Sequence, residues 1–137
     1  MSPSLSHDKL SAFLAGSPYL RFLGLQLEAV EDGVLATLPF SPHLVGNVML
    51  PAIHGGVLAA FLETTARAGL LVLPEIIKVP VASNITIDYL RSGRAVLTYA
   101  KARVIKAGRR VSNVHVEAWQ EDVTRPVAAL RGHFLMG

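Results

Sequence analysis

The most informative part of the sequence is Asn47-Val-Met-Leu-Pro-Ala-Ile-His54-Gly55-Gly56-Val-Leu-Ala-Ala-Phe-Leu-Glu63. It places His-Gly-Gly at the start of a strongly apolar helix and a carboxylate nine residues after the histidine. A helix that begins with two glycines presents unhindered backbone N–H groups to an incoming oxygen. An ionised carboxylate in an apolar helix is costly unless it is paired or used in chemistry. The stretch therefore predicts an acyl-transfer site, in which backbone donors polarise a carbonyl and the carboxylate attacks it or activates water.

Structural explanations for the same residues stay open. Glu63 and Arg67 are spaced i, i+4 with the acid nearer the helix N-terminus, which is the favourable order for a salt bridge. Gly55 and Gly56 can serve tight backbone packing, because glycine has no side chain. His54 can be a capping or core histidine. A chemical site accounts for all of these residues together, whereas the structural explanations need a separate reason for each.

This spacing resembles the signature of hotdog-fold acyl-CoA thioesterases, especially the phenylacetic-acid-degradation (PaaI-like) type. That family carries an Asn, then His-Gly-Gly, then an Asp or Glu nine residues after the His. The matching residues here are Asn47, His54, Gly55, Gly56 and Glu63. Asn47 lies one residue further from His54 than the family pattern has it. The order of the other expected elements also matches, so the resemblance covers nearly the whole chain.

The resemblance implies an α+β hotdog fold, in which an antiparallel β-sheet wraps around one long central α-helix. The residue pattern agrees with that layout. Apolar residues on nearly all sides, ended by Pro74, predict a buried helix over residues 55–73, and a short helix over residues 8–15 is expected before it. Residues 41–51 are expected to form a loop. Alternating residues predict strands at 23–30, 34–40, 82–91, 95–105, 111–120 and 127–136, the last three joined as an antiparallel meander.

The composition predicts a single domain over residues 1–137. Of these residues 51% are apolar and 17% charged, which suggests that subunits bury apolar surface against each other. Glu63 and Arg67 interrupt the longest apolar run, so we expect neither a transmembrane helix nor a membrane partner. The N-terminus lacks the pattern of a signal peptide. The absence of cysteine excludes disulfides and thiol nucleophiles, and a cytoplasmic location is expected.

The net charge of +3 does not require a nucleic-acid partner. The basic residues gather in the C-terminal half near expected strand ends and turns, where a cluster can hold the phosphates of coenzyme A. Arg91, Arg109 and Arg110 are the candidate phosphate contacts, and a solvated sheet face is the alternative for each. The histidines are scattered without metal-ligand spacing, so no metal is expected. No cofactor is expected either, since coenzyme A is part of the substrate.

Helix geometry constrains the candidate site. Gly55 and Glu63 are eight residues apart, which is roughly 12 Å along a helix axis. One thioester therefore cannot reach both groups of the same chain. Two antiparallel central helices across a two-fold axis would bring each Gly55 toward the other chain's Glu63. The hypothesis thus requires a homodimer with sites at its interface, and the family resemblance implies that such dimers often form a homotetramer.

Thioester hydrolysis is the chemistry that these residues predict, with an acyl-CoA as substrate. The Gly55 N–H, aided by the helix dipole, would stabilise the oxyanion, and Glu63 would act as general base or as nucleophile. Asn47 would bind the thioester oxygen or position water, and His54 would orient the loop. Two further residues are candidate substrate contacts: Gly56 and Ser83. The apolar neighbours suit a small, medium-chain or aryl acyl group.

Three other functions remain open from the sequence. A hotdog-fold dehydratase of 3-hydroxyacyl thioesters resembles the chain in Met49-Leu-Pro51 and in a central-helix carboxylate. In dehydratases that carboxylate lies closer to the helix-start glycine than Glu63 lies to Gly56, so the spacing favours the thioesterase. A non-catalytic acyl-CoA-binding protein would share the fold. A structural or interaction protein would use Glu63 only to pair with Arg67.

Overall fold

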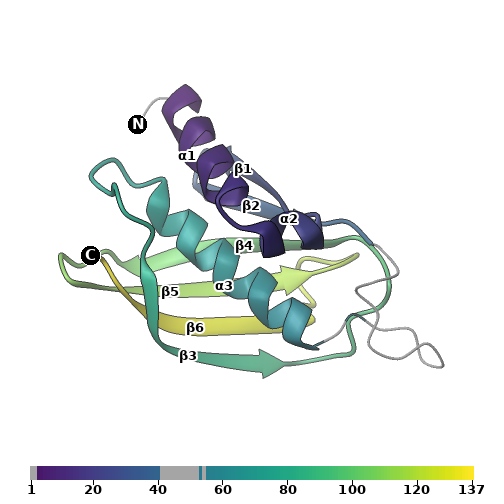
Figure 1. Cartoon of the computed structure of the whole chain (residues 1–137). Coiled ribbons are helices and arrows are strands. Elements are labelled where there is room, and N and C mark those ends of the chain that lie inside the picture. Colours follow the sequence, from purple (N-terminus) through teal and green to yellow (C-terminus); the bar gives the residue numbers. More distant parts are fainter. Residues whose placement is uncertain (1–2, 41–52, 54) are drawn as a thin grey trace.

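An antiparallel six-stranded sheet carries the long helix α3 across one of its faces (Figure 1). The computed structural model describes residues 3–40, 53 and 55–137. In chain order the elements are α1 (Pro3–Ala15), α2 (Pro18–Leu23), β1 (Gln26–Val30), β2 (Gly33–Leu38), α3 (Gly55–Leu71), β3 (Val81–Tyr89), β4 (Thr98–Lys106), β5 (Val111–Trp119) and β6 (Ala128–Leu135). This arrangement confirms the predicted α+β layout of one long helix on an antiparallel sheet.

The strand order in the sheet is β1-β2-β4-β5-β6-β3. Strands β4, β5 and β6 form the predicted meander, and β5 buries alternate residues as its pattern indicates. Strand β3 does not pair with β4, which follows it in the chain, but crosses over to pair antiparallel with β6. Strand β3 is consequently an edge strand, and its free edge faces away from the other strands of the sheet (Figure 1).

Helix α3 packs closely on the sheet because its sheet-facing residues are large and apolar or very small. Phe61 and Leu62 are completely buried in the main core. At Gly69 the helix approaches the sheet so closely that an added β-carbon would lie 2.8 Å from the β-carbon of Ala102. Most of the helix surface is buried, as predicted, and the partly exposed stripe away from the sheet carries Glu63 and Arg67.

The N-terminal segment differs from the sequence-based expectation. A strand was expected to begin at residue 23, but residues Pro18–Leu23 form helix α2 and β1 begins at Gln26. The local signals explain the helix: Ser17 Oγ accepts from the Leu20 N–H at 3.3 Å, and proline occupies the first turn. Gly24 ends the helix in the left-handed conformation at φ 77°. Helix α1 also starts earlier than expected, at Pro3.

Lys9 of α1 holds the far end of α3. Its ammonium donates to the carbonyl oxygens of Leu71, Leu73 and Ile76 at 2.9, 3.2 and 2.5 Å. These carbonyls lie at or just beyond the C-terminus of α3, where backbone acceptors lack helical partners and a positive charge is favourable. Desolvation lowers the pKa of Lys9 below its usual value. None of the described helices is both long and apolar enough to cross a membrane.

Candidate active site

The N-terminus of α3 opens into a groove at the surface. Gly55 and Gly56 are both exposed there. The groove has a volume of about 440 Å³, and its walls come from the start of α3, the end of β3 and the segment that follows β3. Its lining residues are Ile53, Gly55, Leu58, Tyr89, Leu90, Arg91, Ser92 and Gly93. A groove against the positive end of a helix dipole suits a carbonyl oxygen that gains negative charge during reaction.

Backbone hydrogen bonds fix the segment that forms one wall of this groove. The N–H groups of Leu90 and Arg91 both donate to the carbonyl oxygen of Val127, at 2.9 and 3.2 Å. The Ile53 N–H donates to the carbonyl oxygen of Gly93 at 2.8 Å. The bond between Ile53 and Gly93 ties the residue just before the His-Gly-Gly sequence to this wall of the groove, so the wall and the start of α3 are held together.

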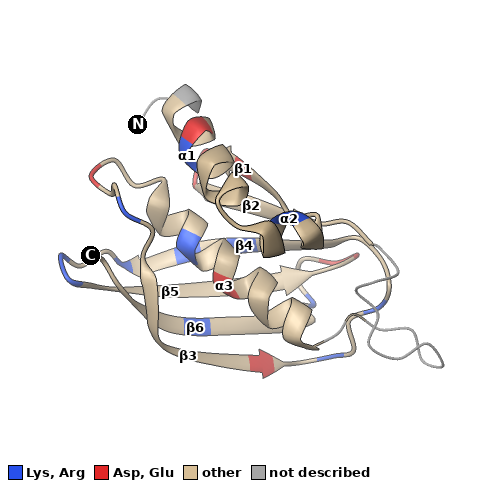
Figure 2. Cartoon of the chain, viewed as in Figure 1, with Lys and Arg blue, Asp and Glu red and all other residues tan. Residues whose placement is uncertain are grey.

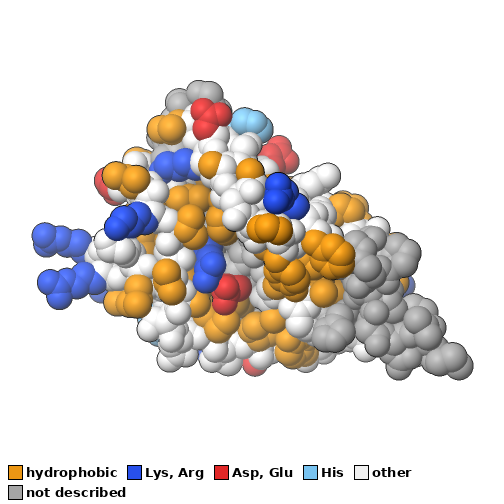
Figure 3. All heavy atoms as spheres, viewed as in Figure 1, with side chains coloured by type: hydrophobic (Ala, Val, Ile, Leu, Met, Phe, Trp, Pro, Cys, Tyr) orange, Lys and Arg blue, Asp and Glu red, His pale blue; other side chains and the backbone are white. Residues whose placement is uncertain are grey.

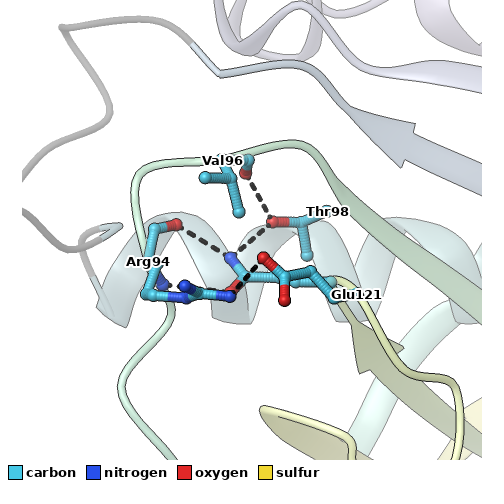
Figure 4. A network of polar contacts seen from close by, with 5 residues as sticks. Arg94, Val96, Thr98 and Glu121 are labelled. Atoms are coloured by element: carbon cyan, nitrogen blue, oxygen red, sulfur yellow. Dashed lines mark hydrogen bonds and ion pairs between the residues drawn. The ribbon is translucent and has the colours of Figure 1, made fainter.

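Gln120 anchors the same segment one residue further along, at Arg94. Figure 4 shows the polar network around Arg94, Thr98 and Glu121. Its side-chain amide accepts from the Arg94 N–H at 3.1 Å and donates to the Arg94 carbonyl oxygen at 2.8 Å. The amide also donates to Thr98 Oγ1 at 3.1 Å, and the Arg94 guanidinium pairs with Glu121 at 2.5 Å. Gln120 is only 9% exposed, so these bonds satisfy a buried amide and make the wall of the groove part of the folded core.

Tyr89 is a site residue that the sequence analysis did not single out. Its hydroxyl donates to the carbonyl oxygen of Gly55 at 2.9 Å. Its ring carbons lie 3.7–3.8 Å from the position that a β-carbon on Gly55 would take. The sequence held one signal for this placement, since the alternation of β3 puts Tyr89 on the same face as Ile85 and Ile87, which pack on the core.

Glu63 and Arg67 form the ion pair that their spacing predicts. Arg67 Nη2 lies 3.2 Å from Glu63 Oε2, and the two side chains are 29% and 31% exposed. The carboxylate is therefore partly open to solvent rather than buried. Among the described residues Arg67 Nε has no hydrogen-bond acceptor although it is buried. Figure 2 shows the two charged positions on α3, and in Figure 3 a red and a blue side chain lie together on this face among hydrophobic ones.

Within one subunit the two principal catalytic candidates, Gly55 and Glu63, do not lie close together. Gly55 and Glu63 both lie on α3, eight residues and roughly 12 Å apart along its axis. Ser83 is an exposed residue at an irregularity of β3, six residues before Tyr89 and thus roughly 20 Å from the groove along the strand. Asn47 and His54 lie outside the described residues.

The three candidate phosphate contacts are divided between the two ends of the sheet. Arg91 lines the groove and donates to the carbonyl oxygen of Pro126. Arg109 and Arg110 are exposed in the turn between β4 and β5. That turn lies at the opposite end, because the start of β5 pairs with the end of β6, which pairs with the start of β3.

A larger pocket, of about 540 Å³, lies on the outer face of the sheet, away from α3. It is lined by residues of β4, β5 and β6 together with Asp32, whose carboxylate is 2.6 Å from the Lys101 ammonium. That bond is the principal cause that lowers the pKa of Asp32. Neither Gly55 nor Glu63, the two described residues proposed for catalysis, lines this pocket. The smaller groove is the better candidate for the site because it adjoins the N–H groups at the start of α3.

Comparisons with known proteins identify the family to which the chain belongs. The sequence model of the family described as "Thioesterase superfamily" matches residues 50–127. The chain is 32% identical over 125 residues to the medium/long-chain acyl-CoA thioesterase YigI of Salmonella typhimurium, covering 80% of each protein. The YigI protein of Escherichia coli is 30% identical over the same length and coverage.

Solved structures show the same architecture. A Shewanella oneidensis protein related to the thioesterase superfamily has a TM-score of 0.78 and 27% identity, covering 99% of this chain and 100% of its own. The Escherichia coli PaaI protein from the phenylacetic acid degradation operon has a TM-score of 0.83 and 22% identity, covering 98% and 95%. The family model spans the start of α3, its carboxylate and the segment after β3. The chain therefore belongs to the thioesterase superfamily and is a thioester hydrolase with the hotdog fold.

Proposed function

We propose that this protein hydrolyses the thioester of an acyl-CoA with a medium-length acyl chain, in the groove at the N-terminus of α3. The observation that carries the proposal is the position of Gly55, exposed at the helix start and bordering a groove of about 440 Å³, in a chain of the thioesterase superfamily. The relatives named as medium/long-chain acyl-CoA thioesterases support an aliphatic chain. An aryl acyl group is the other candidate that the apolar lining suits.

The proposed reaction adds water across the thioester. The water oxygen bonds to the carbonyl carbon, and the carbonyl oxygen becomes an oxyanion that accepts a hydrogen bond from the Gly55 N–H. As general base, Glu63 takes the water proton, the C–S bond of the tetrahedral intermediate breaks, and the coenzyme A sulfur leaves and is protonated. As nucleophile, the Glu63 carboxylate attacks the carbonyl carbon instead, the C–S bond breaks to give an anhydride and the coenzyme A thiolate, which is protonated, and water then hydrolyses the anhydride. The products are a carboxylic acid and free coenzyme A.

The site that we propose combines Gly55 of one subunit with Glu63 of another. The open edge of β3 supports such a pairing, because an unpaired strand edge with exposed apolar residues favours addition of another strand. Val81, Tyr89 and Leu90 are exposed on or next to this strand. A two-fold axis would make β3 antiparallel to its copy and reverse the second α3 relative to the first. A homotetramer would be built from two such dimers.

The same axis offers a reason for the separated arginines. In a dimer with antiparallel β3 strands, the turn that carries Arg109 and Arg110 in one subunit lies at the same end of the assembly as Arg91 in the other. Two of the three proposed phosphate contacts would then come from the partner. The nucleotide of coenzyme A would lie at the surface, close to the subunit boundary.

The proposal is tested by assaying purified protein against acyl-CoA thioesters of short, medium and long chains and against an aryl acyl-CoA, with detection of free thiol. We expect turnover with highest kcat/KM at a medium chain length. Hydration of crotonyl-CoA without thiol release would indicate a dehydratase instead. Binding of acyl-CoA without any product would indicate a non-catalytic binder, and either result would contradict the proposal.

Replacing Arg91 by alanine is expected to raise KM for acyl-CoA by roughly 10- to 100-fold while kcat changes little, because a charge-assisted phosphate contact contributes roughly 1.5–3 kcal/mol to binding. The effect should be smaller on an acyl-pantetheine that lacks the nucleotide. Arg103→Ala is the matched control, since Arg103 is an exposed arginine lining the pocket on the outer sheet face. Equal changes with both substrates would contradict a nucleotide contact at Arg91.

A further inference from the structure

Helix α3 begins with two glycines. Gly55 and Gly56 follow each other in its first turn, and glycine has the greatest backbone freedom of any residue. An oxyanion donor contributes to catalysis only when it is held in place before the charge develops. An oxyanion donor at these two glycines therefore has to be held in position by contacts from outside the helix.

Tyr89 contacts Gly55 in two ways. The phenol hydroxyl donates to the Gly55 carbonyl oxygen at 2.9 Å, which restrains the peptide between Gly55 and Gly56. The ring lies at van der Waals distance, 3.7–3.8 Å, from the place where a side chain on Gly55 would begin. The Tyr89 ring thus packs beside the α-carbon of Gly55 at ordinary contact distance, and both residues line the groove.

The position of Tyr89 is itself well defined. It is the last residue of β3 and pairs with Ala128 of β6, and the next two residues donate their N–H groups to Val127. Gly55 follows closely on Ile53, whose N–H is bonded to Gly93 of the same wall. Two bonds consequently hold the start of α3. One is the backbone bond of Ile53, just before the helix, and the other is the bond from the Tyr89 side chain to Gly55.

We propose that Tyr89 is a positioning residue for thioester hydrolysis. By bonding the Gly55 carbonyl oxygen it fixes the Gly55–Gly56 peptide and, through the backbone torsions of Gly55, limits the directions in which the Gly55 N–H can point toward the developing oxyanion. This inference rests on the proposed function, since it names the residue that orients its oxyanion donor. Strand β3 also supplies the edge at which we place the second subunit. A shift of that edge would therefore move Tyr89 and, through its hydrogen bond, Gly55. The chemistry at the thioester stays with Gly55 and Glu63.

The test is Tyr89→Phe, which removes the hydroxyl and keeps the ring. We expect kcat to fall roughly 2- to 10-fold, as one lost hydrogen bond allows, while KM for acyl-CoA changes less than about twofold. Tyr99→Phe is the matched control, because Tyr99 stacks on Trp119 on the outer face with ring centroids 5.8 Å apart. In a Gly55→Ala background, where the backbone has less freedom, removing the Tyr89 hydroxyl should lower kcat by a smaller factor.

Amide hydrogen exchange tests the same inference without turnover. Exchange of the Gly55 and Gly56 amides should be roughly 2- to 10-fold faster in Tyr89→Phe than in the wild type or Tyr99→Phe, since local opening loses the restraint. Unchanged exchange together with unchanged kcat would overturn the role of Tyr89. A rise in KM alone would assign Tyr89 to substrate contact and also overturn it. Wild-type protein inactive on every acyl-CoA would defeat the proposed function, whereas the exchange result would still decide whether Tyr89 restrains the helix start.

Discussion

Replacing Gly55 by proline is expected to reduce kcat about 10²- to 10³-fold, the usual cost of losing one oxyanion donor. Proline removes the backbone N–H that we propose as the donor, yet it is tolerated in the first turn of a helix, where that N–H has no helical acceptor. The structure places Gly55 at the first position of α3 and not in a left-handed conformation. The measurement is steady-state hydrolysis of the best acyl-CoA, with thermal unfolding to check the fold.

Gly55→Ala is the matched comparison for this variant. It keeps the N–H, and the added β-carbon would meet the Tyr89 ring only at ordinary contact distance, 3.7 Å. We therefore expect alanine to lower kcat far less than proline does. If alanine and proline reduce turnover equally, or if proline leaves it near the wild-type level, the Gly55 N–H is not the oxyanion donor.

The second large effect is expected for Glu63→Gln, which keeps the size of the side chain and removes its charge. A general base or nucleophile at this position predicts a fall in kcat of at least about 10²-fold. The stability should change by less than about 1 kcal/mol, because the Glu63–Arg67 pair is nearly one-third exposed and such pairs contribute little. Turnover and melting temperature are measured on the same preparation.

Two variants separate catalysis from simple pairing at this position. Glu117→Gln makes the same chemical change at an exposed residue on the outer face of the sheet and should leave kcat unaltered. Arg67→Gln breaks the ion pair but keeps the Glu63 carboxylate, so it should cost much less activity than Glu63→Gln. Near-normal turnover in Glu63→Gln with a clear loss of stability would mean that Glu63 serves only as the partner of Arg67.

Most of the fold could be predicted because its signals are local. The apolar run between Gly55 and Pro74 predicts α3, and period-two alternation predicts the faces of the later strands. The strand order could not be read in the same way, since pairing of β3 with β6 depends on contacts between distant residues. Helix α2 carries end signals at Ser17, Pro18 and Gly24, but the sequence does not predict it because six residues are too few for apolar periodicity to distinguish a helix from a break between elements.

In the candidate site, too, the sequence predicts features that depend on neighbouring residues but not contacts between distant ones. The i, i+4 spacing of Glu63 and Arg67 predicts the observed ion pair, and the two glycines predict an accessible helix start. The hydrogen bond between Tyr89 and Gly55 joins residues 34 positions apart, so no short motif contains it. The burial of Gln120 against the backbone of Arg94 is hidden for the same reason. The first contact depends on the packing of α3 beside the end of β3, and the second depends on the pairing of β4 with β5.

In the proposed dimer each active site takes Gly55 from one subunit and Glu63 from the other. Mixed dimers test this arrangement. Gly55→Pro and Glu63→Gln chains are co-expressed with different tags, the mixed dimer is isolated by both tags, and light scattering confirms its size. One site then combines the intact Gly55 and the intact Glu63, while the other carries both changes, so we expect about half of the wild-type turnover per dimer. Mixed dimers no more active than either parent, or a fully active wild-type monomer, would contradict a site shared between subunits.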